Sequence, residues 1–515
     1  MDPAPPAPSP KPFGPLRGLL WPIHRHELKK LLPMLLLFFF ISFVYSILRN
    51  TKDTLVVTAP GGGASLIPFL KVYGVFPMAI GFMLGYAKLS NVLNKEQIFY
   101  ASLAPFAGFF LLFAALFPLR AVLHPAALDP THGPLTPWLA NLLALGRIWL
   151  FSLFYVMSEL WASMALSLSF WGFANDVVKL EESRRFYALF GVGANLALLT
   201  VRPANQGLHW LEARLVAVRP MEPWTAYVAL LMALVLACIL VIALIYRWIQ
   251  RAVLTDPRLY TPADQSARKR LRPRMSLPQA FRFLARSRYL LLIAVLVVGY
   301  GVTTNLIEVT WKTHLARLHP DPTSYQDYMA DFAFATGAAT LFMMLFVANN
   351  VIRRFGWTVA ALFTPVVFLV TGCGFFGFLL LEDGLGPLLA AHGTTPLALA
   401  VLFGAIQNVA SKATKYALFD PTKEMAYIPL DQESKVKGKA AIDVVGHRLG
   451  KAGGALLNQA LIGLFHSLRA VPGLIALLVM AMLGGWIWAG VELGRAFQKR
   501  VRDQADRTRE AGSGP

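Results

Sequence analysis

The stretch LLPMLLLFFFISFVYSILRNTKDTLVVT, residues 31–58, decides how the rest of the chain is interpreted. It is mostly apolar and long enough to cross a bilayer, yet its second half contains the polar string RNTKD, residues 49–53. A charge near the middle of a membrane helix costs roughly 2.5–3.5 kcal/mol on insertion scales, so it is retained where something uses it. Two cations and an anion together therefore favour a buried polar substrate site. The alternative is that they mark the end of a short helix.

The composition is that of a polytopic membrane protein and not of a soluble enzyme. The 515 residues are 56% hydrophobic and 15% charged, with a mean hydropathy of +0.54. The net charge of +20 does not indicate nucleic-acid binding, because the Lys and Arg residues concentrate between apolar runs, where membrane topology requires them. Membrane lipid is the expected partner. The two cysteines, Cys238 and Cys373, lie in apolar runs and support neither a disulfide framework nor a metal cluster.

About twelve apolar stretches can cross the membrane, since about 30 Å of hydrocarbon takes roughly 20 residues. Basic residues in the alternate loops place both termini in the cytoplasm by the positive-inside rule. The stretches lie near 31–58, 67–90, 97–118, 147–174, 185–203, 224–248, 288–313, 329–350, 357–381, 396–418, 440–466 and 470–496.

The two halves of the chain look like weak repeats, because the first and seventh stretches share the polar break and the fourth and tenth lead into similar polar loops. We expect an all-α membrane protein of about twelve helices in two six-helix halves. This is the plan of major-facilitator transporters, whose substrate lies near the midplane between the halves. The predicted divisions are a basic, proline-rich cytoplasmic start (1–30), the halves (31–248 and 288–496), a basic cytoplasmic linker (249–287) and a polar cytoplasmic tail (497–515).

In that architecture the first, fourth, seventh and tenth helices line the cavity, and each carries polar or charged residues. For Glu159 and Glu308, an interhelical ion pair that fixes packing is the competing interpretation. For Lys412 and Lys415, a topology signal at the cytoplasmic end is equally favoured. The candidates are Arg49, Lys52 and Asp53 in the first helix, Tyr155 and Glu159 in the fourth, Asn305 and Glu308 in the seventh, and Lys412 and Lys415 in the tenth.

Residues 419–454 hold many lysines, which suit a polyphosphate because lysine acts on phosphate as a point charge. A solvated loop is the simpler interpretation for Lys435, Lys437 and Lys439, although Lys439 stays among the candidate transport residues. Lys451 lies between glycines and is expected to face the bundle interior. No ATP-hydrolysis motif or metal-ligand spacing is present, so we expect no cofactor, no metal and transport driven by exchange or by a gradient.

Seven strings in the chain resemble the ATP/ADP translocase family, the nucleotide transporters of plastids and obligate intracellular bacteria. The resemblance runs from about residue 12 to residue 495. The strings are RNTKDTLVV (49–57), IPFLK (67–71), SELW (158–161), FWGFAN (170–175), NLIEVTWK (305–312), KEMAYIPL (423–430) and KGKAAIDVV (437–445).

The resemblance implies a twelve-helix exchanger of the bacterial inner (cell) membrane, expected to be a monomer, that imports ATP for ADP and phosphate. Members of the family use four charged residues for transport, and these match Lys52, Glu159, Glu308 and, in the 435–451 stretch, Lys451. Asn50 departs from the pattern, since many members have Asp there.

Two other functions compete with nucleotide exchange. The family also contains proton-coupled nucleotide importers, in which Glu159 or Glu308 would carry the proton. A polytopic membrane transferase would need a catalytic acid, base or metal cluster at one membrane face. The polar residues lie instead within several separated helices, which favours a carrier and not an enzyme. In the leading hypothesis Asn305 or Tyr155 contacts base or phosphate, and the nucleobase preference stays open.

Overall fold

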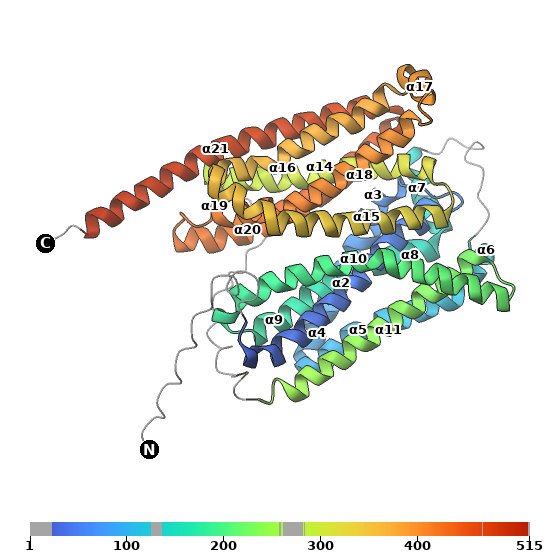
Figure 1. The fold of residues 1–515 in the computed structure, drawn as a ribbon, viewed down its shortest axis with the longest axis horizontal. Helices are drawn as coiled ribbons and strands as arrows, with labels where there is room; N and C mark the ends of the chain where they lie inside the picture. Colours follow the sequence, from blue (N-terminus) through green and yellow to red (C-terminus); the bar gives the residue numbers. More distant parts are fainter. Residues whose placement is uncertain are drawn as a thin grey trace.

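The computed structural model describes residues 23–124, 136–256, 259–260, 282, 284–465 and 467–512, and within these ranges all regular secondary structure is helical. The helices form two groups, one above the other in Figure 1. The start of α2 and the end of α21 lie toward the same end of the bundle, which we call the terminal face. The opposite end, where α2 (Leu28–Val57) and α14 (Arg288–Leu318) finish, is the far face.

The first group is made from residues of the first half of the chain. After the single turn η1 (Arg25–Glu27) and α2, it contains α3 (Leu66–Phe69), η2 (Leu70–Val75), α4 (Phe76–Val92), α5 (Lys95–Leu116), η3 (Phe117–Leu119), α6 (Arg120–Leu123), α7 (Pro137–Arg147), α8 (Trp149–Trp161), η5 (Ala162–Phe170), α9 (Trp171–Val177), α10 (Leu180–Val218) and α11 (Pro223–Ala252).

The second group begins with α14. It continues with α15 (Pro322–Phe342), η7 (Met343–Val347), α16 (Ala348–Leu380), α17 (Glu382–Ala390), α18 (Pro396–Thr414), η8 (Lys415–Phe419), α19 (Asp420–Ala426), α20 (Gln432–Phe465), η9 (Leu468–Ala470) and α21 (Pro472–Gly512). Gly356 has φ +78°, a left-handed conformation open to glycine, and it breaks α16 near its start.

Eleven of the described helical segments are long and apolar enough to cross a membrane. The predicted span that is missing from this count lies in α20. Its apolar part, Ala452–Phe465, is shorter, because the first half of α20 carries the lysines and other polar residues of the 435–451 region. The predicted all-α membrane fold is therefore confirmed. The count differs from twelve at the eleventh predicted stretch, where glycine and charge interrupt the apolar run.

The two halves repeat one unusual feature. Wide π-helical turns interrupt the second and fourth spans of the first half, at η2 and η5, and the corresponding spans of the second half, at η7 and η8. π-helical turns are rare and frequently occur at functional sites. Their matching positions agree with the weak sequence repeat.

Two tryptophans fix the helices that carry the polar breaks. The indole N–H of Trp161 on α8 donates to the carbonyl oxygen of Ile41 on α2 at 3.1 Å. The indole N–H of Trp311 on α14 donates to the carbonyl oxygen of Val401 on α18 at 3.0 Å. Both indoles are fully buried, so each bond ties one cavity-lining helix to another within its own half.

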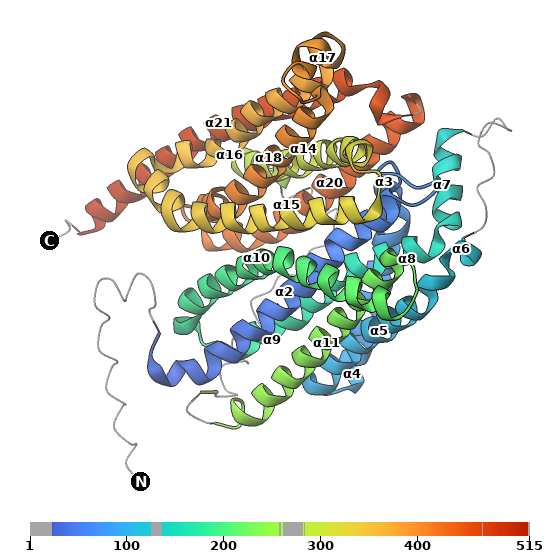
Figure 2. The same cartoon turned by 45° about the vertical axis from the view of Figure 1, so that its right-hand side comes forward.

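Helices α10 and α15 run alongside each other between the groups, as both views show (Figures 1 and 2). The contact is close at Gly337, where an added Cβ would lie 2.8 Å from the Cβ of Leu198. Nearer the far face, Arg202 Nε lies 2.9 Å from Asp331 Oδ1, and His209 Nε2 lies 2.8 Å from Asp327 Oδ1. These contacts hold the halves together between the middle of the bundle and the far face.

Candidate functional site

The site begins at Lys52, a buried lysine on α2. Its Nζ lies 3.1 Å from Glu159 Oε1 on α8 and 2.9 Å from Oδ1 of the neighbouring Asp53. The same ammonium sits 3.9 Å from the centroid of the Tyr155 ring. A cation in a water-poor setting is strongly attracted to anions, so two carboxylates and an aromatic face stabilise it here. The predicted partnership of the first and fourth helices is thus present.

Asp53 connects this cluster to the other half. Its Oδ2 accepts a 2.7 Å hydrogen bond from Lys312 Nζ on α14, while its Oδ1 faces Lys52. Asp53 is fully buried and Lys312 is almost so. A buried pair of this kind is stable only while both partners are present, because either charge alone would be left desolvated. Asp53 is therefore a charged link between the two halves.

Glu308 gathers cations from three helices. Its Oε1 lies 3.0 Å from Lys312 one turn along α14, 3.4 Å from Arg49 on α2 and 4.0 Å from Lys412 on α18. The chain of ion pairs thus runs without a break from Glu159 to Lys412 through both halves. It joins the four helices that the sequence predicts to line the cavity.

Among the cations linked by these ion pairs, Lys412 has the weakest contact with a carboxylate. Its buried Nζ has no hydrogen-bond partner among the described residues, and it lies 4.6 Å from the centroid of the Phe332 ring. Lys415, one turn further, instead forms a 2.6 Å ion pair with Asp420. The structure therefore places Lys412 in the network, whereas Lys415 has its own partner outside it.

A second contact between the halves lies beside the network. Lys71, at the π-helical turn η2, donates a 2.8 Å hydrogen bond from Nζ to Asn305 Oδ1 on α14. The amide nitrogen of Asn305 donates to the carbonyl oxygen of Gly301 at 3.1 Å, which fixes its orientation. Asn305 lies one turn before Glu308, so Lys71 adds a cation next to the partly buried carboxylate of Glu308.

The network and its neighbour carry more positive than negative charge. Among the described side chains, five cations face three carboxylates, which leaves a formal surplus of two positive charges in a largely buried region. Such a surplus attracts an anion with several charges, such as a polyphosphate. The cations are Arg49, Lys52, Lys71, Lys312 and Lys412, and the carboxylates are Asp53, Glu159 and Glu308.

The other predicted site residues have different positions. The hydroxyl of Tyr155 is buried without a hydrogen-bond partner among the described residues, and only its ring contacts Lys52. Lys439 is exposed and pairs with Glu424 at 2.5 Å, apart from the network. The side chain of Lys451 lies outside the part of the chain that the structure describes.

Sequence reasoning did not single out Lys71 and Lys312, although both signals were available. Lys312 follows Glu308 by four residues, the spacing of neighbours on one helical face. Lys71 is a lone cation inside a predicted membrane stretch. What the sequence could not supply was the contact across the halves, which brings Lys312 to Asp53 and Lys71 to Asn305.

Comparison with known proteins adds an independent result. A family model described as TLC ATP/ADP transporter matches residues 8–497. The chain is 53% identical over 489 residues to ADP,ATP carrier protein 1 of Chlamydia trachomatis, covering 95% of this chain and 92% of that protein. It is 43% identical over 506 residues to the chloroplastic ADP,ATP carrier protein 2 of Arabidopsis thaliana, covering 98% and 79%.

Solved structures support the fold alone. A bacterial homologue of the iron transporter ferroportin, in an inward-facing state, is 13% identical with a TM-score of 0.55, covering 92% of this chain and 100% of that chain. The inward-open xylose transporter XylE from E. coli is 15% identical with a TM-score of 0.51, covering 89% and 95%. The chain therefore has the fold of these transporters.

Proposed function

We propose, from the premise that the chain belongs to the TLC ATP/ADP transporter family, that this integral membrane protein exchanges ATP for ADP across its membrane. Relatives named ADP,ATP carrier proteins cover most of the chain at high identity. The observation that carries the proposal is the buried network with its surplus of two positive charges. The protein is a secondary transporter and not an enzyme, and it works by alternating access of the two halves.

In the proposed cycle, substrate phosphates compete with the protein's own carboxylates for the lysines. Lys412 offers a buried ammonium without a hydrogen-bond partner in the described structure, and it is proposed as the first contact of a phosphate. Lys52 pairs with Glu159, and in the proposed cycle a phosphate oxygen takes the place of this carboxylate. When substrate leaves, Glu159 and Glu308 pair with the lysines again and reset the empty carrier.

Phosphate accompanies ADP in this proposal. ADP carries about one negative charge fewer than ATP near neutral pH, so one-for-one exchange moves net charge unless phosphate travels with ADP. Lys52 and Lys451 are proposed to bind the inner phosphates that both nucleotides share, and Asn305 to help place the separate phosphate. The bond from Lys71 to Asn305 supports this role, because it puts a cation beside the amide.

The remaining assignments follow from sequence. The halves are proposed to span 31–248 and 288–496, with a basic linker at 249–287. Both termini are proposed to face the cytoplasm of a bacterium, the protein to lie in the inner (cell) membrane and the carrier to act as a monomer. The excess of Lys and Arg in the corresponding loops supports this orientation.

Exchange in liposomes tests the proposal. Purified protein is reconstituted with internal ADP, and uptake of labelled ATP is compared for wild type, Lys412→Ala and Lys439→Ala. Loss of about 1.4 kcal/mol of substrate interaction corresponds to a tenfold effect, and we expect at least that for Lys412→Ala. Lys439→Ala is the matched control, because it removes an exposed lysine that lies outside the network. Equal uptake by all three proteins contradicts the assignment of the site.

Proton-coupled uptake is the second candidate, because Glu308 is a carboxylate inside a membrane span. The two functions separate in the same liposomes. Exchange requires internal nucleotide and persists without a proton gradient. Uptake that persists without internal nucleotide but collapses with the proton gradient would replace exchange by proton coupling.

A further inference from the structure

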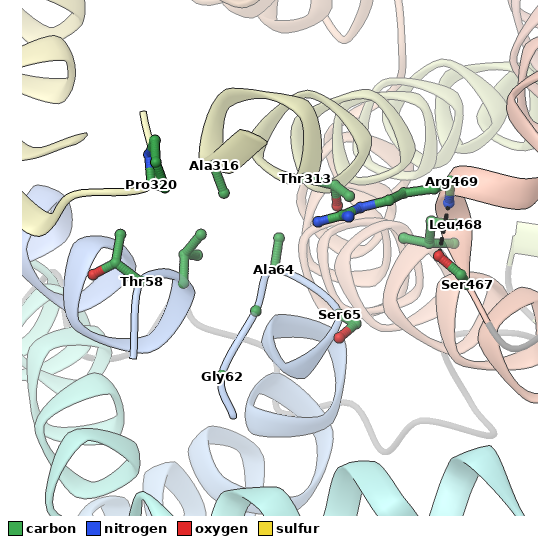
Figure 3. A pocket seen from close by; sticks show the side chains of 12 residues that line it. Thr58, Gly62, Ala64, Ser65, Thr313, Ala316, Pro320, Ser467, Leu468 and Arg469 are labelled. Carbon is green, nitrogen blue, oxygen red and sulfur yellow. Dashed lines mark hydrogen bonds between the residues drawn. The ribbon is translucent and has the colours of Figure 1, made fainter. Parts of the chain in front are cut away.

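A pocket of about 370 Å³ lies on the far-face side of the central network (Figure 3). This volume is at the lower end of the range of about 300–1,000 Å³ that is usual for small-molecule sites. Residues of both halves line it. The first half contributes residues within 57–65, and the second half contributes three residues within 313–320, at the end of α14 and in the loop after it, together with the turn 467–469. Of these lining residues, Val57 is one turn after Asp53, and Thr313 directly follows Lys312.

The polar groups of the pocket suit an anion. Arg469 extends its guanidinium from η9 toward Thr313, into the space between α14 and the loop before α3 (Figure 3). Four hydroxyl-bearing residues accompany it, and none of the lining residues is acidic. The backbone N–H of Arg469 donates to Ser467 Oγ at 3.1 Å, which fixes the turn that carries the guanidinium.

Three arginines of the far face have acidic partners, whereas Arg469 and Arg219 are exposed and have none among the described residues. Arg120 pairs with Glu222, Arg202 with Asp331 and Arg317 with Glu382. The guanidinium of Arg469 has no ion-pair or hydrogen-bond partner among the residues that the structure describes. The hydroxyls of Thr58 and Thr313 donate to the backbone carbonyl oxygens of Thr54 and Val309, so the guanidinium is the main donor of the pocket. An arginine fork is well suited to phosphate, which it can bind through two parallel hydrogen bonds.

We infer that this pocket is a second anion site, separate from the central network, that takes inorganic phosphate or the terminal phosphoryl group of a nucleotide. The choice of phosphate among anions rests on the proposed nucleotide exchange, whereas the anion site itself rests on the pocket. Because both halves line the pocket, its full set of contacts exists while the far face is closed. A bound phosphate therefore favours the closed far face.

Thiol labelling of purified protein in detergent tests the site directly. Cys238 and Cys373 are replaced by Ala, and Ser65→Cys is introduced in the pocket. Ser65 makes no side-chain capping bond to α3, so this substitution removes little. Ala391→Cys, exposed after α17 and outside the pocket lining, is the matched control. The probes are inorganic phosphate, ATP and adenosine.

Phosphate at about four times its dissociation constant leaves about one site in five free, so labelling of Ser65→Cys should slow about fivefold. Ala391→Cys should be unaffected, and adenosine should protect neither position. Protection by phosphate identifies free phosphate as sufficient, and protection by ATP alone assigns the site to the phosphoryl group of the nucleotide.

Two further variants give the test its specificity. Arg469→Gln should abolish protection, whereas Arg317→Gln, which changes a neighbouring arginine outside the pocket lining, should retain it. Lys412→Ala should also retain protection, since it alters the central network. The inference is overturned if neither phosphate nor ATP protects, if protection survives Arg469→Gln, or if Lys412→Ala removes it. Labelling does not measure exchange, so these outcomes leave the proposed function to its own test.

Discussion

Within the described residues, charged side chains join the two halves in the central network and near the far face. The ion pairs of these two regions differ more in their burial than in the distance between their charges. In the central network, Asp53 and Lys312 lie 2.7 Å apart, with 0% and 5% of their side chains exposed. Near the far face, Arg202 and Asp331 lie 2.9 Å apart, with 46% and 57% exposed. Water can replace either partner in the second pair, whereas in the first it cannot do so without opening the bundle.

This difference assigns different tasks to the two regions. Exposed ion pairs typically contribute about 0–1 kcal/mol, so the far-face pairs can form and break repeatedly at little cost. Removing one partner of a buried pair costs about 3–5 kcal/mol. A central network of buried charges therefore needs a replacement anion whenever the halves separate there, and a phosphate can provide one. The far face needs no such ligand to open.

The largest effect should come from breaking the buried link. In Lys312→Ala the Asp53 carboxylate loses its partner across the halves, so we expect a loss of about 3–5 kcal/mol in stability and no measurable exchange. Thermal unfolding in detergent and ATP/ADP exchange in liposomes measure the two effects. The double variant Asp53→Asn, Lys312→Gln removes both charges and should recover most of the unfolding midpoint, but not exchange. If Lys312→Ala were as stable as wild type, Asp53 would not depend on Lys312 as its partner in a buried ion pair.

The next effect concerns the carboxylates that compete with substrate. Glu308→Gln should lower the exchange rate at least tenfold, while the dissociation constant of ATP changes less than threefold, because the cations that bind phosphate remain. Glu159→Gln should behave in the same way, since it faces Lys52. Binding titrations and exchange rates on the same purified variants decide. Affinity lost in proportion to rate would mean that the carboxylates contact substrate directly.

Asn305 should have a narrower effect, on phosphate alone. Asn305→Ala removes the acceptor of the Lys71 hydrogen bond and should change the ratio of phosphate to ADP transported more than the nucleotide exchange rate. Dual-label flux of ADP and phosphate measures the ratio. Asn458→Ala on α20 is a suitable control, since its amide contacts the backbone of Asn305 and not Lys71. An unchanged ratio with equally reduced exchange would assign Asn305 to the nucleotide.

The sequence drew attention to many residues of the central network, because membrane burial makes polar residues conspicuous. Three apolar runs are each interrupted by charge, at residues 49–53, at Glu159 and at Glu308. These interruptions indicated three of the helices that meet in the structure. The same reasoning left Lys412 balanced between a site residue and a topology signal. Only its packing under Phe332 and beside Glu308 places it in the network.

The far-face contacts could not be predicted in this way. Arg202, Asp327 and Asp331 lie near the ends of the stretches predicted from sequence, 185–203 and 329–350. Charge is common at such ends and carries no signal of a partner. Their pairing depends on how α10 lies against α15, a relation between halves that no local pattern encodes. The pocket around Arg469 is hidden for the same reason, since it is assembled from three segments of both halves.

The smallest effect should come from the far face itself. Arg202→Gln breaks an ion pair whose partners are both about half exposed, so stability should change by less than about 1 kcal/mol and exchange by less than about threefold.

Thiol labelling measures how often the far face opens. A less stable closed far face should raise the rate at which a cysteine at Asn205, on the adjacent turn of α10, reacts with a soluble thiol reagent. Asn205 lies at this contact, where its amide donates to Asp327 Oδ1 at 2.6 Å. The control is Arg288→Gln, at the start of α14, which breaks a solvent-accessible pair with Glu492 inside the second half. Faster labelling in Arg202→Gln but not in Arg288→Gln would identify the exposed pairs as a reversible closure. A loss of stability as large as that of Lys312→Ala would remove the distinction between the two regions.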